Sequence, residues 1–104
     1  MGIKSTTAQS VRISSTGNDF FIEHTFLGDG SELIYAQQSF GFSAESLTIA
    51  NDSNQFVLSI SYDGATLDGK INAGETKCFT PTGKTSVYIK TESGSTDKAR
   101  IWAS

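Results

Sequence analysis

Short runs of alternating apolar and polar residues, each bounded by turn-forming residues, are the feature that most constrains the fold of this 104-residue chain. Successive side chains of a β-strand point to opposite faces, so a period of two is typical of strands with one face in a core. No ten-residue stretch shows the 3.6-residue period of an amphipathic helix. Turn signals recur about every eight to twelve residues, which favours an antiparallel β-sandwich, Ig-like or jelly-roll-like, of about eight strands.

The alternation also predicts where the strands lie and how they connect. We expect strands at 9–14, 19–27, 47–50, 56–62, 67–71, 75–79, 85–91 and 98–103, with irregular or edge strands between 33 and 42. Two β-hairpins are predicted, one joining 47–49 to 56–62 and one joining 85–91 to 98–103. Residues 1–8 are small and polar without periodicity, so we expect a flexible N-terminal arm. Residues 9–104 are then a single domain.

The parity of the apolar residues within each run predicts the core. The residues expected to face inward are Val11, Ile13, Phe20, Ile22, Leu47, Ile49, Phe56, Leu58, Ile60, Ile71, Val87, Ile89 and Ile101. We find no internal repeat and no low-complexity linker in the sequence.

Charge and cysteine content limit the partners and the compartment. The formal net charge of −3 argues against nucleic acid or an anionic membrane as the partner. Residues 1–69 are acidic overall and residues 70–104 are basic overall, so either the charges of the two halves mix on the surface or the molecule is polar and suited to head-to-tail packing. A single cysteine forms no intrachain disulfide, and the first residues lack the apolar region of a signal peptide. We therefore expect synthesis and folding in a cytoplasm.

The sequence offers little that could support catalysis or bind a metal. His24 is the only histidine and shares its parity with apolar neighbours, so we interpret it as a hydrogen-bonded core or edge imidazole rather than a catalytic base. Cys78 is expected to be buried beside Phe79 in an apolar strand, with no basic helix terminus to activate its thiol. Asp52, Asp63 and Asp68 could converge on calcium, but Asp-Gly at a strand end is ordinary turn chemistry. We predict no catalytic residue, no cofactor and no metal.

Aromatic residues remain as the candidates for an interaction surface. We single out Tyr35, Tyr62, Tyr88 and Trp102. Pairing of the last two strands would bring Tyr88 and Trp102 together on an outer face, where exposed aromatic side chains tend to mark interfaces. The alternative is that a second layer of the same domain covers them.

Residues 46–103 resemble small β-sandwich structural proteins of tailed bacteriophages. The similarity lies in the motifs Ile-x-Asn-Asp (49–52), Ser-Tyr-Asp-Gly (61–64), Gly-Glu-Thr (74–76), Val-Tyr-Ile-Lys (87–90) and Arg-Ile-Trp-Ala (100–103). The resemblance implies a protein made in the host cytoplasm, free of disulfides and cofactors, and assembled in many copies on a phage head, neck or tail. It brings no catalytic positions.

Taken with the resemblance, the sequence predicts a non-enzymatic virion component, either a capsid decoration or a head–tail accessory protein. Its expected partners are further copies of itself and other virion proteins such as capsid or tail. The alternative function is a carbohydrate- or cell-surface-binding β-sandwich module, and a small hydrolase ranks third.

Overall fold

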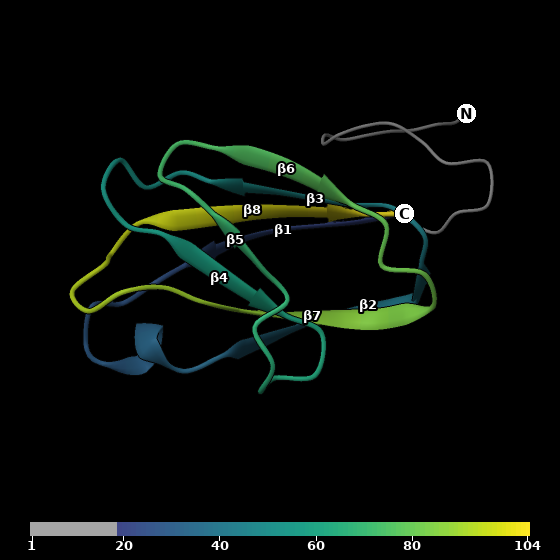
Figure 1. The fold of residues 1–104 in the computed structure, drawn as a ribbon, viewed down its shortest axis with the longest axis horizontal. Helices are drawn as coiled ribbons and strands as arrows, with labels where there is room; N and C mark the ends of the chain where they lie inside the picture. The colour runs from purple at the N-terminus through teal and green to yellow at the C-terminus, as the bar shows by residue number, and fades with distance from the viewer. Residues whose placement is uncertain (1–18) are drawn as a thin grey trace, which may run out of the picture.

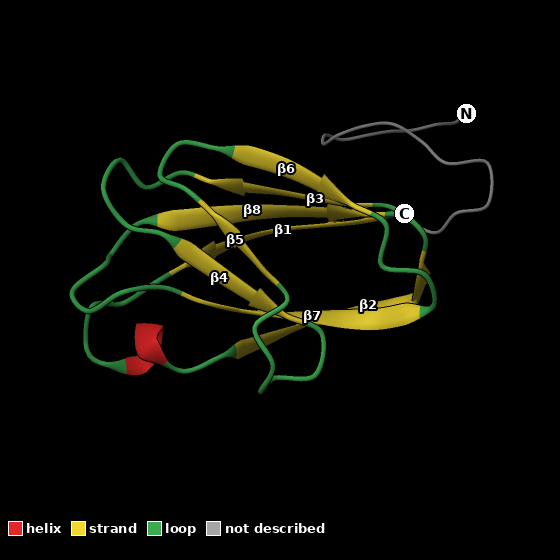
Figure 2. Ribbon diagram, in the orientation of Figure 1, coloured by secondary structure: helices red, strands yellow, loops and turns green. Residues whose placement is uncertain are grey.

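Two antiparallel β-sheets packed face to face make up residues 19–104, which are the part of the chain that the computed structural model describes (Figures 1 and 2). In order, sheet A contains β1 (Phe20–Thr25), β8 (Lys98–Ala103), β3 (Leu47–Asn51) and β6 (Thr76–Phe79), and sheet B contains β2 (Ala36–Ala44), β7 (Lys84–Lys90), β4 (Leu58–Ser61) and β5 (Gly69–Ile71). One 3-10 turn, η1 (Ser31–Leu33), lies between β1 and β2. These eight strands of residues 19–104 confirm the predicted all-β sandwich.

The strands pair from the two ends of this region inward. β1 pairs with β8, β2 with β7, β3 with β6 and β4 with β5, like one long hairpin wrapped around a core. This order is that of the eight-stranded jelly roll. Within residues 19–104, only the connection from β4 to β5 joins neighbours in the same sheet, and each of the other connections crosses between sheets.

Both predicted hairpins are therefore wrong. β3 lies in sheet A and β4 in sheet B, and β7 and β8 are likewise in different sheets. The alternating pattern shows which side of a strand is apolar but carries no information on which other strand it pairs with. The strand predicted at 9–14 and the arm predicted at 1–8 lie outside the described residues.

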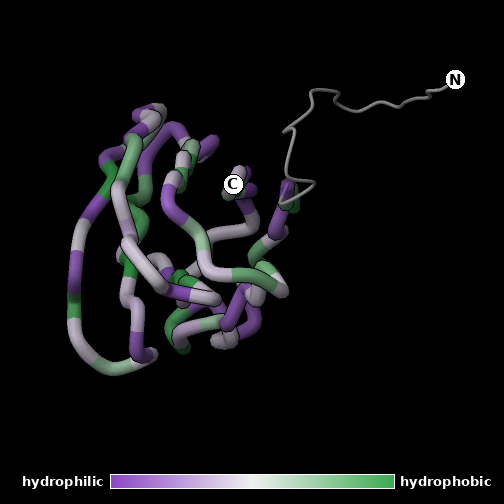
Figure 3. The backbone as a smooth tube through the Cα atoms, turned by 90° about the vertical axis from the view of Figure 1, so that its right-hand side faces the viewer, coloured by the Kyte–Doolittle hydropathy of each residue, from purple (hydrophilic) through white to green (hydrophobic). Residues whose placement is uncertain are grey.

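The core between the sheets matches most of the residues selected by parity. Leu47, Ile49, Leu58, Ile60, Ile71, Val87, Ile89 and Ile101 are all buried, as predicted. Phe20, Ile22 and Phe56 face inward less completely, and Phe26, Phe40 and three alanines join the core in addition. Figure 3 shows the alternation as changes of hydropathy along the strands. Full burial of one large aliphatic side chain stabilises the fold by about 1.5–3 kcal/mol.

The acidic and basic halves of the chain interleave in both sheets. In sheet A, β1 and β3 come from residues 1–69 and alternate with β8 and β6 from residues 70–104. In sheet B, β7 from the basic half lies between β2 and β4 from the acidic half, and β5 spans the boundary between the halves. Among residues 19–104, two ion pairs join the halves, Glu23 with Lys98 at 3.6 Å and Asp52 with Arg100 at 2.7 Å. The charges are thus mixed over the surface, and strand order gives no support to a head-to-tail polarity.

A buried asparagine fixes the crossing from sheet A to sheet B. The side-chain amide of Asn51, at the end of β3, donates hydrogen bonds to the carbonyl oxygens of Phe56 at 2.8 Å and Ile71 at 3.0 Å. Its own Oδ1 accepts a hydrogen bond from the backbone amide of Ser53 at 3.2 Å. One side chain therefore bonds three backbone groups at the ends of strands and in the connection between them, where an unpaired buried polar group would be costly.

A buried glutamate ties two loops together at one end of the sandwich. Glu32, in η1, accepts hydrogen bonds from the backbone amides of Gly30 at 3.0 Å and Gly94 at 2.9 Å. Its backbone carbonyl accepts a third hydrogen bond, from the amide of Thr91 at 2.8 Å. These bonds, that from Gly94 above all, hold the pKa of the Glu32 carboxyl below its usual value. The loop between β1 and β2 is thereby fixed to the loop between β7 and β8.

Among residues 19–104, no helix is long and apolar enough to cross a membrane.

Candidate interaction surface

The outer face of sheet A carries a row of four side chains that crosses all four strands. Strand register places Phe21 of β1 opposite Trp102 of β8, Trp102 opposite Thr48 of β3, and Thr48 opposite Cys78 of β6. The Phe21 and Trp102 rings lie 5.2 Å apart between centroids, tilted by 40°. Phe21 is 54% exposed and Trp102 is 37% exposed, so this aromatic pair faces solvent. We call Phe21, Trp102, Thr48 and Cys78 the sheet A row.

An arginine also contacts the Trp102 ring. The Arg100 guanidinium lies 5.2 Å from the centre of the Trp102 ring, within cation–π range. Its Nε and Nη2 atoms donate to the two carboxylate oxygens of Asp52, at 2.7 Å and 2.9 Å. This two-pronged hydrogen bond raises the pKa of Arg100 and fixes the plane of its head group. The Trp102 ring thus contacts both Phe21 and a guanidinium that is bound to Asp52.

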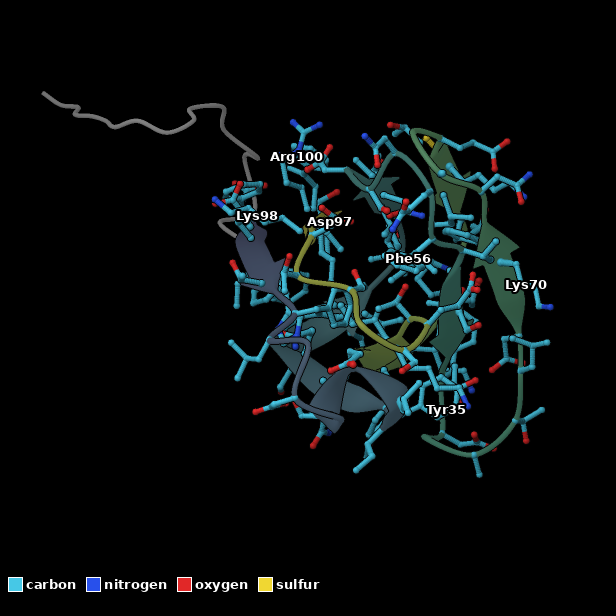
Figure 4. The ribbon with its side chains drawn as sticks, turned by 90° about the vertical axis from the view of Figure 1, so that its left-hand side faces the viewer. Tyr35, Phe56, Lys70, Asp97, Lys98 and Arg100 are labelled. Atoms are coloured by element: carbon cyan, nitrogen blue, oxygen red, sulfur yellow. The ribbon has the colours of Figure 1, made fainter. Side chains whose placement is uncertain are left out.

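The structure separates the aromatic residues singled out from the sequence. Tyr88 lies on the outer face of sheet B, because β7 pairs with β2 and β4 and not with β8. The expectation that Tyr88 and Trp102 share a face is therefore wrong, and the true neighbour of Trp102 is Phe21. Figure 4 shows this separation of the outer faces, with Lys98 and Arg100 on one side of the molecule and Tyr35 and Lys70 on the other.

The tyrosines on sheet B are each partly covered by the chain itself. The amino group of Lys90 lies 4.5 Å from the ring centre of Tyr35. The Tyr88 ring packs so closely on Gly64 that an added Cβ would lie 3.1 Å from it. Tyr62 packs against the core, and burial followed by the charge of Asp68 raises its pKa. The outer face of sheet B is thus partly covered by a loop and by side chains of the same chain.

The carboxylates considered for calcium are engaged in local structure. Asp63 accepts hydrogen bonds from the backbone amides of Ala65 and Thr66, both shorter than 3 Å, which depress its pKa strongly. Asp68 accepts a hydrogen bond from the Tyr62 amide at 2.8 Å, and Asp52 binds Arg100 on the other sheet. Among residues 19–104, no group of three acidic, histidine or cysteine side chains could hold a metal ion.

His24 and Cys78 are far apart in orientation and in position. His24 lies on β1, where Gln38 Nε2 is 3.4 Å from its Nδ1 and the Phe26 ring packs edge-on at 4.8 Å. Partial burial lowers its pKa. Cys78 lies on β6, at the opposite edge of sheet A, and is exposed, so its predicted burial is wrong. The described geometry brings no nucleophile to the histidine.

A second group of exposed apolar residues escaped the sequence analysis. Leu27, Leu33 and Ile34 are all exposed and lie on the connection between β1 and β2. Glu32 anchors this connection through its bonds to the loop at Gly94. Leu27 ends the predicted strand 19–27 on the parity of Phe21, so its exposure could have been predicted, whereas Leu33 and Ile34 follow no alternating run that would show on which side they lie.

Comparison with known proteins adds one structural likeness. No protein-family model matches the sequence, and no curated protein matches it either. The structure is similar to a crystal structure of PliG from Aeromonas hydrophila, a periplasmic inhibitor of g-type lysozyme, with a TM-score of 0.49 and 9% sequence identity. The alignment covers 90% of this chain and 91% of that one.

Proposed function

We propose that this protein is a non-enzymatic assembly protein that self-associates, and binds its other partners, through the outer face of sheet A. The observation that carries the proposal is the exposed pair of Phe21 and Trp102, with Arg100 over the Trp102 ring. Aromatic residues and arginine are enriched at the centres of protein interfaces, where a few such side chains supply most of the binding energy. Side chains that are already ordered lose little further entropy on binding.

The position of the site on the face of a sheet favours a protein partner over a small substrate. The sheet A row runs across four hydrogen-bonded strands, with small Thr48 and Cys78 beside the aromatic pair. A sheet face of this kind offers a broad contact area, whereas small-molecule sites are typically concave. On one side of it, toward the start of β8, the ion pairs of Glu23 with Lys98 and Asp52 with Arg100 supply charged groups like those at the rim of a protein interface.

A tailed-phage virion is the proposed setting, and it rests on the motif resemblance. In that setting the protein is made in the host cytoplasm and is assembled as a homo-oligomer on a capsid or on the head–tail region. The jelly-roll strand order fits this proposal by analogy, since viral capsid domains use the same architecture. Lectin domains use it too, so strand order does not separate the proposal from its alternative.

Self-association can be tested with two variants that differ only in which apolar side chains they remove. Phe21→Ser/Trp102→Ser deletes the aromatic pair, and Leu67→Ser removes a 51% exposed leucine from the loop between β4 and β5. Light scattering after gel filtration, over a range of concentrations, should show a species larger than a monomer for the wild type and for Leu67→Ser. The double variant should be a monomer.

Trp102 provides a second readout because it is the only tryptophan of the chain. Its fluorescence emission should move to shorter wavelength as the wild-type protein associates and the indole leaves water. A wild type that stays monomeric with unchanged emission at every concentration would refute self-association through this face. Loss of assembly in Leu67→Ser alone would place the interface on the other side of the molecule.

The carbohydrate-binding alternative makes a different prediction at the same residue. A partly exposed indole can stack on a sugar ring, and Trp102 is held in position to do so by Phe21 and Arg100. Binding to a glycan array that is lost in Trp102→Ala, from a protein that is strictly monomeric, would replace the assembly proposal with the lectin one.

A further inference from the structure

The outer face of sheet A divides into a half with large side chains and a half with small ones. Along the sheet A row, the two aromatic rings lie on β1 and β8, whereas the threonine and the cysteine lie on β3 and β6. The next row on this face runs from Glu23 and Arg100 on the first two strands to Ala50 and Thr76 on the other two. We call β1 with β8 the large half of the face and β3 with β6 the small half.

Two copies that meet through the same face are related by a two-fold axis, which for two facing sheets lies within the interface. An axis across the strands would set Trp102 against the partner's Trp102, so that the large halves would hold the small halves apart. An axis along the strands exchanges the halves, so that Phe21 meets the partner's Cys78 and Trp102 meets the partner's Thr48. Of the two, the axis along the strands fills the space above the small half, as close packing requires.

We propose that the protein forms a two-fold symmetric dimer whose axis runs along the strands of sheet A, between β8 and β3. This inference rests on the proposed self-association through sheet A and specifies its geometry. The strands of the two facing sheets are then nearly aligned, which is the common arrangement of sheets packed face to face. The aromatic pair of each copy lies on the small half of the other.

Charged groups on the same face agree with this axis. The Asp52 amide donates to the Lys98 carbonyl at 3.0 Å, so the two residues lie side by side where β3 ends and β8 begins. An axis along the strands sets Lys98 of each copy against Asp52 of the other, which makes two contacts between opposite charges. Arg100, close to the axis, is neutralised by Asp52 of its own copy. An axis across the strands sets β8 on β8 and does not bring Lys98 and Asp52 face to face.

Exchanging a large and a small side chain tests the packing. Thr48→Trp should raise the dissociation constant of the dimer by about tenfold or more, because two large rings then compete for one space. An equimolar mixture of Thr48→Trp and Trp102→Ser should associate more tightly than either variant alone, since each indole then meets a small residue. Ser59→Trp, which adds the same ring to the outer face of sheet B, should leave association unchanged.

Light scattering over a range of concentrations measures all of these samples. Tighter association of Thr48→Trp alone would overturn the proposal in favour of the axis across the strands. A mixture that associates no more tightly than its two components would overturn it as well.

Cross-linking tests the axis without touching the aromatic pair. Glu23 and Thr76 are exposed and lie on the two edge strands of sheet A. In a Cys78→Ser background, a short bismaleimide should link Glu23→Cys to Thr76→Cys as a covalent dimer when the two variants are mixed. Neither variant should link to itself. The wild type should not either, because the two Cys78 thiols of the proposed dimer are three strand spacings apart, about 14 Å.

The outcomes separate this geometry from self-association itself. Covalent dimers of a single variant or of the wild type, seen on a denaturing gel, would place the axis across the strands. A protein that is oligomeric by light scattering but is not linked in the mixture would also overturn the proposed axis, and self-association would stand. A protein that is monomeric at every concentration would refute both.

Discussion

Trp102 and Tyr88 occupy comparable positions, each on an inner strand of its sheet with its side chain on the outer face. Tyr88 is covered by Gly64 from the loop between β4 and β5, whereas Trp102 is left in contact with solvent beside Phe21. The chain thus covers one outer face with its own loop and leaves the other open. The difference teaches that an aromatic side chain on an outer face is a candidate for partner binding only after intramolecular cover has been accounted for.

The largest loss of stability is expected when the packing of the β4–β5 loop on Tyr88 is disturbed. Gly64 and Gly41 both have φ of +84°, but only at Gly64 would an added Cβ meet the Tyr88 ring. Gly41→Ala should lower the free energy of unfolding by about 1 kcal/mol through backbone strain alone, and Gly64→Ala by about 2 kcal/mol. Urea denaturation measures both. Equal losses would mean that the loop does not pack on Tyr88 in solution.

Exchanging the aromatic residues for serine should separate stability from assembly. Tyr88→Ser should lower the free energy of unfolding by about 1–2 kcal/mol, since it removes a partly buried ring. Trp102→Ser should lower it by less than Tyr88→Ser does, because the Trp102 ring is the more exposed of the two, but it should weaken self-association. Denaturant titration and light scattering on the same samples check the pair. The comparison between the two faces fails if the two substitutions cost similar stability.

A smaller loss of stability is expected when the ion pair between Asp52 and Arg100 is weakened. Asp52→Asn should lower the free energy of unfolding by about 0.5–1 kcal/mol and should weaken self-association, because Arg100 is then free to leave Trp102. Glu75→Gln is the control, since it removes an exposed ion pair with Lys77 away from the aromatic pair. Similar loss of assembly in both variants would show that self-association depends on the net charge of the protein and not on the bonds between Asp52 and Arg100.

The smallest effect is the pH dependence of stability that arises from His24, on the edge strand β1 of sheet A. Burial lowers the pKa of His24 in the folded protein below its ordinary value of 6.5. The unfolded chain therefore takes up a proton first as pH falls, so stability that is present above pH 6.5 is lost as pH falls through the folded pKa. The melting temperature should decline slightly from pH 7 to pH 5 in the wild type. His24→Phe should flatten that decline, and an unchanged slope would place its origin elsewhere.

Strand positions and inward faces could be predicted from the sequence, because period-two alternation is a local property of a half-buried strand. Ile49, Leu58 and Val87 were assigned to the core on that ground, and all three are buried. Cys78 could have been placed correctly by the same reasoning. It precedes the inward-facing Phe79 on a strand, so its side chain must point outward.

Pairing between distant segments could not be predicted. Phe21 and Trp102 are brought together because β1 pairs with β8, and no local signal distinguishes that pairing from a hairpin between β7 and β8. Burial of Glu32 is equally hidden, since the Gly94 amide that binds its carboxylate comes from a loop 62 residues away along the chain. The candidate site is built almost wholly from such long-range contacts, so the sequence yielded one of its two aromatic residues.

The place of β8 between β1 and β3 also sets the order of events during synthesis. Sheet A lacks an inner strand until residues 98–103 have been made, so its two earlier halves, β1 on one side and β3 with β6 on the other, have nothing to join them. A nascent or truncated chain therefore presents Phe21 without Trp102. Only a chain that contains residues 98–103 carries both aromatic rings of this surface.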